Sequence, residues 1–338
     1  MNSRLRVIDF GRATPLRSQT LWHAVAHGVS AGAPPTLSFV RPSAPYVGIG
    51  YHRHLDEVDE KYCRSEGLPI YRRMVGGGPV YLDGDQLFFQ ICLPAKAVSP
   101  SRFVALRELL SPAVAAFRAA GIEASLDDNH EICVADRKVC GHGAGQIEDA
   151  VVVCGNLIER FDHDRATLIL RLPDKIMRAE TLRLMRRHVS PTSADPDTFR
   201  RAMIDAYASA LDLRVTAGEL TGYERAKLGR LDELFLNARW LTGSQPPSRQ
   251  GIRQVKIRAG VWVFAAERED ARVVATIVNG TVEGAWLRAN ALPSSRTVAA
   301  ERAVLGVALS AVPHALAGFG PAGAQLAAAF ALADGKRL

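Results

Sequence analysis

Three consecutive glycines, Gly76, Gly77 and Gly78, follow an expected strand that ends in Arg72 and Arg73. A glycine run lets the backbone approach a ligand closely and point successive N–H groups at an anion. An arginine beside such a loop supplies a planar pair of donors for a carboxylate or a phosphate. Because strand residues alternate between faces, we expect only one of the two arginines to reach the ligand. The run indicates an anion-binding loop. If it has no function, it is a mobile glycine turn preceded by two surface arginines.

Lys138 is a second residue with chemical potential, at the edge of an expected hairpin over residues 133–140. An exposed hairpin lysine is usually a solvated charge, but here Gly141, Gly143 and Gly145 follow and let the backbone wrap around a ligand. The spacing is not a dinucleotide fingerprint, because no helix follows and the acidic residue is missing. A lysine held against a phosphate and a carboxylate can offset the charge that builds when these anions react. That role fits an adenylating enzyme.

The cysteines and histidines form no recognisable metal or disulfide pattern. The five cysteines are odd in number and contain no C-x-x-C pair, which argues against a disulfide framework and a zinc site. His52 and His54 have no third ligand near them, so we expect an exposed loop there and no bound metal. The cysteines are Cys63, Cys92, Cys133, Cys140 and Cys154.

Composition and charge narrow the class of protein. A chain of 338 residues, 48% of them hydrophobic, can form one large domain or two domains with full cores. The net charge of +7 suits a nucleotide or an acidic partner, but the arginines are scattered, so nucleic acid is not an expected partner. No apolar run approaches the roughly 18–20 residues of a membrane helix, and residues 1–10 carry no secretion signal. We expect a cytoplasmic protein without a membrane segment.

Strands and helices must position these residues. Short apolar runs predict strands at residues 5–10, 36–41, 46–49, 69–73, 87–93 and 151–157. Helical spacing predicts helices at 19–29, at 57–66 and, capped by Ser99, at about 100–120, and helices dominate 177–211. Pro112 is expected to kink or break the third of these helices. The pattern predicts an α+β fold.

A change in composition divides the chain. Residues 241–251 are rich in Gly, Ser and Pro, which cannot sustain a helix or a central strand, so they are predicted as a linker. Strands are expected beyond it at 252–257, 261–265 and 272–278, with a hairpin turn at Asn279–Gly280 and a helical end. The predicted organisation is a catalytic domain over 1–240, a linker over 241–251 and a small α+β accessory domain over 252–338.

Three segments together resemble the biotin/lipoate protein ligase superfamily, and within it the lipoate–protein ligase A branch. Residues 72–83, RRMVGGGPVYLD, resemble that family's R-R-x-S-G-G-G-A-V-x-H-D loop. Residues 128–141, DNHEICVADRKVCG, resemble its N-D-(x)n-G-R-K-[VI]-S-G hairpin, and residues 154–158, CGNLI, fall where it has H-G-[ST]-L-L. The similarity covers at least residues 5–160.

The resemblance implies a fold and a reaction. The fold would be a mixed β-sheet flanked by helices, with a small α+β accessory domain and a lipoate tunnel behind the glycine loop. ATP and lipoate (or octanoate) would give lipoyl-AMP and pyrophosphate. A lysine of a lipoyl carrier protein, such as a glycine-cleavage H-like protein or a dehydrogenase E2-like domain, would then attack the mixed anhydride. Mg²⁺ would accompany the polyphosphate.

The resemblance also implies residue roles. Lys138 would be catalytic and would contact both the lipoyl carboxylate and the α-phosphate. The residues that would bind ATP and lipoate are Arg73, Gly76, Gly77, Gly78, Pro79, Val80, Tyr81, Asp83, Asn129, Lys138, Gly141, Cys154 and Gly155.

Five positions depart from the family pattern. Val75 replaces a serine, Leu82 a histidine, His130 an aspartate, Cys140 a serine and Cys154 a histidine. These changes keep the backbone scaffold but alter the polarity of the pocket. The loss of a titratable group at Leu82 implies that this histidine is dispensable here or that the activity differs.

Other functions remain open. Related octanoyltransferases work through a cysteine thioester without ATP, and Cys140 or Cys154 would be the nucleophile here, with His142 as its base. Against this, those enzymes carry their cysteine elsewhere and lack an accessory domain, and a cysteine in an apolar strand is more often inert core. A third hypothesis is a non-catalytic regulator that binds an acyl group. The retained Lys138 argues against it, and the substitution at Val75 argues for it. Biotin ligase is the most remote alternative.

Overall fold

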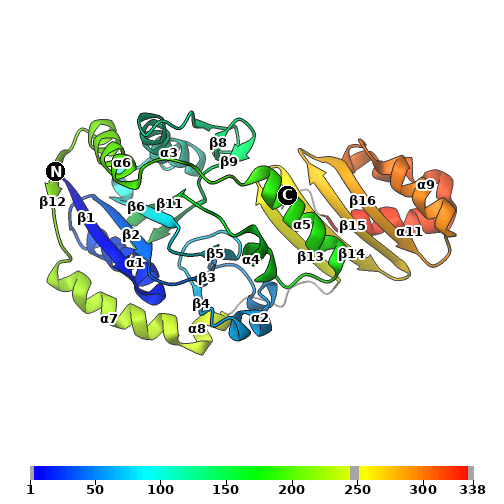
Figure 1. Ribbon diagram of the computed structural model, residues 1–338, viewed down its shortest axis with the longest axis horizontal. Coiled ribbons are helices and arrows are strands. Elements are labelled where there is room, and N and C mark those ends of the chain that lie inside the picture. Colours follow the sequence, from blue (N-terminus) through cyan, green and yellow to red (C-terminus); the bar gives the residue numbers. More distant parts are fainter. Residues whose placement is uncertain (1–3, 244–250, 334–338) are drawn as a thin grey trace. The chain divides into compact units, whose positions relative to one another are not determined.

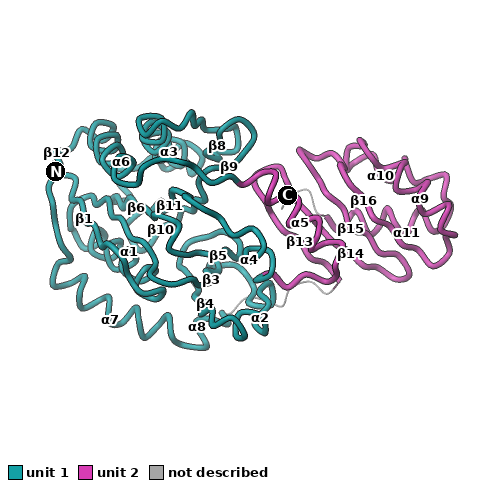
Figure 2. The backbone as a smooth tube through the Cα atoms, viewed as in Figure 1, with its two compact units in different colours: residues 1–169, 190–245 teal, residues 170–189, 246–338 magenta. Residues whose placement is uncertain are grey.

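The computed structural model describes residues 4–243 and 251–333, and the chain divides into two compact units (Figure 2). The first unit comprises Met1–Ile169 and Ser190–Gln245, and the second comprises Leu170–Val189 and Pro246–Leu338. The second unit is therefore built from two separate segments of the chain. No helix within the described ranges is both long and apolar enough to cross a bilayer.

A six-stranded mixed sheet forms the centre of the first unit (Figure 1). Its order is β10-β11-β6-β2-β1-β12, with β1 parallel to β2 and β12 and the other neighbours antiparallel. The strands are β1 (Arg4–Ala13), β2 (Thr36–Pro42), β6 (Gln86–Pro94), β10 (His142–Ile147), β11 (Ala150–Ile158) and β12 (Arg214–Ala217). The α+β class and the mixed sheet expected from the sequence are confirmed.

Helices cover both faces of this sheet. α1 (Pro15–Ser30) lies on one face with α7 (Gly222–Leu236) packed against it, and α3 (Arg102–Ala119) and α6 (Pro196–Leu211) cover the other. Strand alternation divides the core accordingly. Ile91 belongs to the cluster under α3 and α6, whereas Cys92 belongs to the cluster under α1.

Two small sheets carry the remaining strands of the first unit. One has the order β4-β3-β5, and the other has the order β7-β8-β9. Their strands are β3 (Tyr46–Ile49), β4 (Ile70–Arg72), β5 (Val80–Leu82), β7 (Ser125–Leu126), β8 (Ile132–Val134) and β9 (Arg137–Lys138). The short helices beside them are η1 (Leu55–Glu57), α2 (Glu60–Ser65), η2 (Ala95–Ala97), α4 (His163–Leu168) and α8 (Ala238–Thr242).

The second unit is a four-stranded antiparallel sheet between helices. The sheet runs β13 (Ile252–Arg258), β14 (Val261–Arg268), β15 (Ala271–Val278) and β16 (Thr281–Ala289). α5 (Lys175–His188) packs on one face, where the buried Glu180 accepts a hydrogen bond from Thr276 (2.6 Å). The helices α9 (Ser294–Val304), α10 (Val312–Ala315) and α11 (Gly320–Phe330), with the 3₁₀ turns η3 (Leu309–Ala311) and η4 (Ala317–Phe319), complete the unit.

Several local expectations were wrong. Ser101 rather than Ser99 caps α3. Of the kink or break expected at Pro112, the break does not occur, because a proline removes only one bond of the ladder and the helix continues to Ala119. β10 and β12 were not expected as strands, since the glycines of β10 disfavour one. Residues 170–189 belong to the second unit, although the sequence placed them in the first domain. α8 extends into the expected linker 241–251, of which residues 244–250 lie outside the described residues.

Candidate active site

The glycine loop links β4 to β5, which pair with opposite edges of β3. Arg73 begins the loop and its backbone N–H donates to Ile49 O (2.9 Å). Gly77 has a φ of 99°, a region that residues with side chains rarely adopt. A Cβ added to Gly76 or Gly78 would meet no atom within 4 Å. The loop backbone is therefore open to a ligand at these two glycines.

The guanidinium of Arg73 is hydrogen-bonded to backbone carbonyls of this loop. Its Nε donates to Gly76 O (3.0 Å), and its Nη2 donates to Gly76 O (2.8 Å) and Gly78 O (2.9 Å). Its Nη1 is buried and has no hydrogen-bond partner in the part of the chain that the structure describes. Burial lowers the pKa of Arg73. A buried guanidinium with an unused donor favours an incoming anion.

Arg72 has a structural role instead. Its guanidinium donates to the carbonyls of Gly50, Tyr51 and Arg53 on one side and to those of Trp240, Leu241 and Thr242 on the other. Trp240 Nε1 donates back to Arg72 O (2.9 Å). Arg72 thus joins the end of β3 to α8, and the neighbouring arginines occupy different sides as strand alternation predicts.

Lys138 lies on β9, after a turn in which Ala135 has a φ of 52°. Its Nζ is 2.5 Å from Glu131 Oε2, and the Glu131 side chain is only 5% exposed. His142 Nε2 lies 3.7 Å from the same carboxylate oxygen and is 2.7 Å from His130 O, to which it donates if the proton sits on Nε2. The lysine charge is therefore held by a buried carboxylate.

Strand β10 connects the two predicted features. A Cβ on Gly143 would lie 3.7 Å from Gly76 O and 3.7 Å from Cys154 Sγ, so this strand passes directly beside the glycine loop. At Gly145 an added Cβ would approach Val75 Cγ1 to 2.9 Å. Because Gly145 has no side chain, Val75 of the glycine loop can pack directly against β10. At the start of β10, His142 lies 3.7 Å from the Glu131 carboxylate that binds Lys138, so β10 links the glycine loop to this pair.

The cysteines are not poised as nucleophiles in this state. All five are free thiols, and Cys154 alone among them is not fully buried. Burial raises the pKa of Cys154 despite the opposing effect of Arg73, and its thiol donates to Gly143 O (3.4 Å). Burial raises the pKa of Cys140 to about 12. Both are protonated at neutral pH.

Other predicted residues hold the surrounding backbone. Gly141 N donates to Asn156 Oδ1 (2.7 Å), and a Cβ on Gly155 would lie 2.4 Å from the Phe89 ring, which excludes any side chain there. Asn129 is exposed, and its backbone N–H donates to the Asp127 carboxylate (2.9 Å) in the loop before β8.

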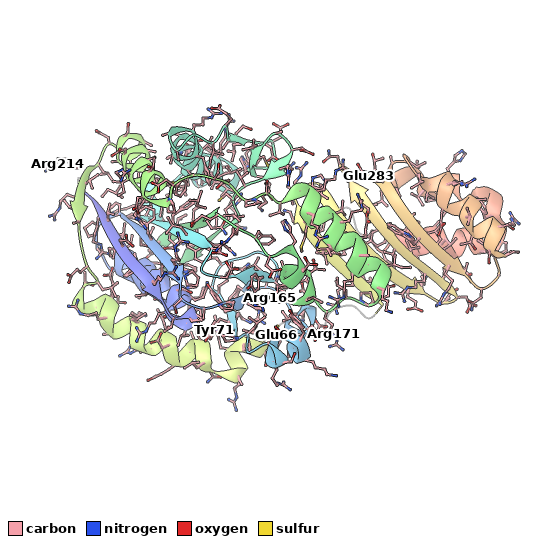
Figure 3. The ribbon with its side chains drawn as sticks, viewed as in Figure 1. Glu66, Tyr71, Arg165, Arg171, Arg214 and Glu283 are labelled. Atoms are coloured by element: carbon pink, nitrogen blue, oxygen red, sulfur yellow. The ribbon has the colours of Figure 1, made fainter. Side chains whose placement is uncertain are left out.

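The strand after the glycine loop contributes mixed surfaces. Pro79 is half-buried and Val80 is exposed. Tyr81 is buried, its pKa raised by that burial, and its hydroxyl bonds Arg165, which lies 3.5 Å from Glu66 (Figure 3). The Asp83 carboxylate accepts from the backbone N–H of Asp85 (3.0 Å), and burial raises the Asp83 pKa. Asp83 thus stabilises the turn between β5 and β6.

Two site residues had no assigned role in the sequence reasoning. Glu131 was visible as a carboxylate two residues before the expected hairpin of Lys138, and this proximity was the available signal. His23 on α1 gave none: its Nδ1 bonds Gln19 O (2.6 Å), and its Nε2 accepts the N–H of Met74 (3.1 Å), the residue after Arg73. Burial lowers the pKa of His23 to about 3, so it is neutral.

Comparisons with known proteins find lipoate ligases and octanoyltransferases. The family model for the lipoyl protein ligase A/B catalytic domain matches residues 15–207. Octanoyltransferase LipM of Moorella thermoacetica is 24% identical over 264 residues, which cover 70% of this chain and 97% of the relative. Lipoate-protein ligase A subunit 1 of Thermoplasma acidophilum is 24% identical over 237 residues, which cover 65% and 89%.

Solved structures share the fold. The bipartite lipoate protein ligase of Thermoplasma acidophilum, from a study with its E2 lipoyl domain, superposes with a TM-score of 0.64 at 23% identity over 74% of this chain and 99% of that one. LipL1 of P. falciparum in complex with lipoate gives 0.57 at 13% identity over 94% and 93%. Since the family model spans more than half of the chain, the protein belongs to the lipoyl protein ligase A/B catalytic domain family, that of lipoate ligases and octanoyltransferases.

Proposed function

We propose that this chain is an ATP-dependent lipoate–protein ligase. It activates lipoate or octanoate as an acyl-AMP and transfers the acyl group to a lysine of a lipoyl carrier domain. The observation that carries the proposal is the buried Arg73, whose unused Nη1 and open glycine loop form an anion site. β10 links this site to the Lys138–Glu131 pair.

The first half-reaction joins two anions. A carboxylate oxygen of the acyl substrate attacks the α-phosphorus of ATP, the bond to the bridging oxygen breaks, and pyrophosphate leaves. Lys138 and Arg73 offset the negative charge, and the N–H groups of the glycine loop bind phosphate oxygens. Mg²⁺ would accompany the ATP phosphates, as it does in other enzymes that use polyphosphate substrates.

The second half-reaction consumes the mixed anhydride. The neutral ε-amine of the carrier lysine attacks the acyl carbon, the bond to the phosphate oxygen breaks, AMP leaves, and the amine proton passes to solvent. A solved structure of lipoate-protein ligase A holds ATP, and one from Thermoplasma acidophilum holds lipoic acid. These support the choice of substrates, and the E2 lipoyl domain studied with the Thermoplasma ligase supports the choice of carrier.

A cysteine-dependent octanoyltransferase is the second candidate. The LipM of Moorella thermoacetica favours it, because this chain spans 97% of that relative. In this chain the nucleophile of such an enzyme would be Cys154, because this cysteine lies beside Gly143 and close to the Arg73 guanidinium. Its raised pKa opposes the role, because a nucleophilic cysteine needs a thiolate.

One experiment separates the two. The purified protein is given octanoate or lipoate with ATP and Mg²⁺, and pyrophosphate release and acyl transfer to an unmodified carrier domain are followed. Lys138→Ala should abolish pyrophosphate release without loss of folding, and Cys154→Ser should retain both activities. Acyl transfer that needs no ATP and disappears in Cys154→Ser contradicts the ligase proposal. Tight acyl or nucleotide binding with neither activity identifies a regulator.

A further inference from the structure

The basic excess of the chain is confined to one of its two units. The second unit carries 17 lysine and arginine residues against 8 aspartate and glutamate residues, a net charge of +9. The first unit carries 25 against 27, a net charge of −2. The overall +7 is therefore the property of the unit that does not hold the glycine loop or Lys138.

Helix α5 and the residues before it concentrate this charge. Residues 170–189 contain six basic and two acidic side chains. The face that packs on the sheet buries Met177, Glu180 and Leu184. Lys175 and Arg186 lie on the exposed face, 11 residues apart, which places them about 16 Å apart along one side of the helix. Figure 1 shows α5 lying across the sheet on the face opposite α9 and α11.

The two carboxylates of this segment are already engaged. Asp174 caps α5 through Met177 N and binds Arg272, and Glu180 binds Arg183 (2.6 Å) and Thr276. Arg187 Nη1 lies 3.4 Å from Oε2 of Glu283, which belongs to β16 and is labelled in Figure 3. With six basic and two acidic side chains, the segment as a whole has a net charge of 6 − 2 = +4.

We propose that the exposed face of α5 docks the protein substrate, a lipoyl carrier domain of net negative charge. This proposal rests on the proposed function, which needs a protein substrate to be captured at low concentration. Complementary charge raises the rate of encounter and fixes orientation. The acidic first unit cannot attract such a carrier over a distance, so the attraction comes from the second unit.

A protein fits this face better than nucleic acid. Apolar side chains lie among the basic ones: Ile176 is 44% exposed, and Leu172 and Leu182 are half-buried. Residues 170–189 contain no Phe, Tyr or Trp on which a base could stack. A rigid helix with basic and aliphatic side chains matches the polar rim and apolar centre of a protein interface.

The test compares two variants with equal charge change in the same unit. Lys175→Glu with Arg186→Glu reverses the α5 face. Arg268→Glu with Arg302→Glu reverses two exposed charges elsewhere on the second unit. Binding of a fluorescently labelled, unmodified acidic lipoyl domain is measured by anisotropy at 50 and 200 mM NaCl. In parallel, pyrophosphate release from ATP and octanoate is measured without carrier.

The α5 variant should bind the carrier at least tenfold more weakly and lose most of the salt dependence, while the control variant binds within twofold of the unaltered protein. Pyrophosphate release should be unchanged in both. Equal weakening by both variants, or none in the α5 variant, overturns the proposal. Tighter binding of a 20-base-pair DNA duplex than of the carrier, lost in the α5 variant, also overturns it. Because binding needs no catalysis, an inactive protein that still docks the carrier through α5 contradicts only the proposed function.

Discussion

At the scale of single residues, side chains of the same type differ in role because their surroundings differ. Arg72 satisfies backbone carbonyls of β3 and α8, whereas Arg73 closes the glycine loop and keeps one donor unused. Lys138 is likewise defined by its partner, because the buried Glu131 carboxylate fixes its Nζ. A charge that is already positioned needs no reorganisation when the reacting anions arrive.

Removing the charge of Glu131 tests this positioning. In Glu131→Gln the ammonium of Lys138 loses its partner and samples other rotamers, so kcat for acyl-AMP formation should fall about tenfold, which corresponds to about 1.4 kcal/mol of barrier. KM for ATP should change little. Steady-state pyrophosphate release measures both constants. Glu131→Asp should recover part of kcat, and a loss confined to KM would contradict a positioning role.

Val75 and Gly145 form a size-matched pair. An alanine at 145 would place its Cβ 2.9 Å from Val75 Cγ1 and push the glycine loop off β10. Gly145→Ala should therefore lower acyl-AMP formation strongly, and Val75→Ala in the same chain should restore much of it. Val75→Ala alone should cost about 1–2 kcal/mol of unfolding free energy. Pyrophosphate release by the four proteins of this cycle gives the coupling, and additive effects would rule out the contact.

At the scale of elements, helix α1 supports the glycine loop through one histidine. His23 accepts the Met74 N–H only as a neutral ring, and burial lowers its pKa to about 3 from the usual 6.5. The unfolded chain takes up a proton below about pH 6.5 and the folded chain does not. Stability is therefore complete above that pH and is lost as the pH falls toward 3.

This linkage gives a measurable pH dependence. Between pH 7 and pH 5 His23 should lower the free energy of unfolding by about 2 kcal/mol. Urea denaturation at the two pH values measures the change, with His23→Gln as the matched control. The glutamine keeps a polar side chain but does not titrate, so its change should be smaller by that amount. An equal change in both proteins would show that other groups cause the acid sensitivity.

The elements also show how far sequence reasoning reaches. Gly76–Gly78 could be predicted as a loop because a glycine run acts through its backbone, and the hairpin of Lys138 followed from its turn. The Glu131–Lys138 bond and the support from His23 could not, because each depends on which elements meet in space. α5 is a further case: an amphipathic pattern predicts a buried face, but it does not say which sheet covers that face.

At the scale of the whole molecule, the two units have separate cores. The clusters of the first unit include Phe39, Phe89 and Phe199, and the cluster of the second includes Phe264 and Phe330. The second unit draws α5 from the middle of the first, so the chain passes between the units at Ile169–Leu170, at Val189–Ser190 and again near residue 245. Separate cores with different net charge suit a division between chemistry and capture of the partner.

The insertion of α5 predicts how the protein tolerates truncation. A chain cut after residue 243 keeps α5 but loses the sheet of the second unit. Met177 and Leu184 would then be exposed to water, and so would the Glu180 carboxylate, which loses its hydrogen bond from Thr276. It should aggregate or elute as oligomers in size-exclusion chromatography. A second chain, cut at the same place and with 170–189 replaced by a Gly/Ser linker, should remain soluble and folded by circular dichroism. If both chains behave alike, α5 does not depend on the second unit, and the division of the molecule into these units is wrong.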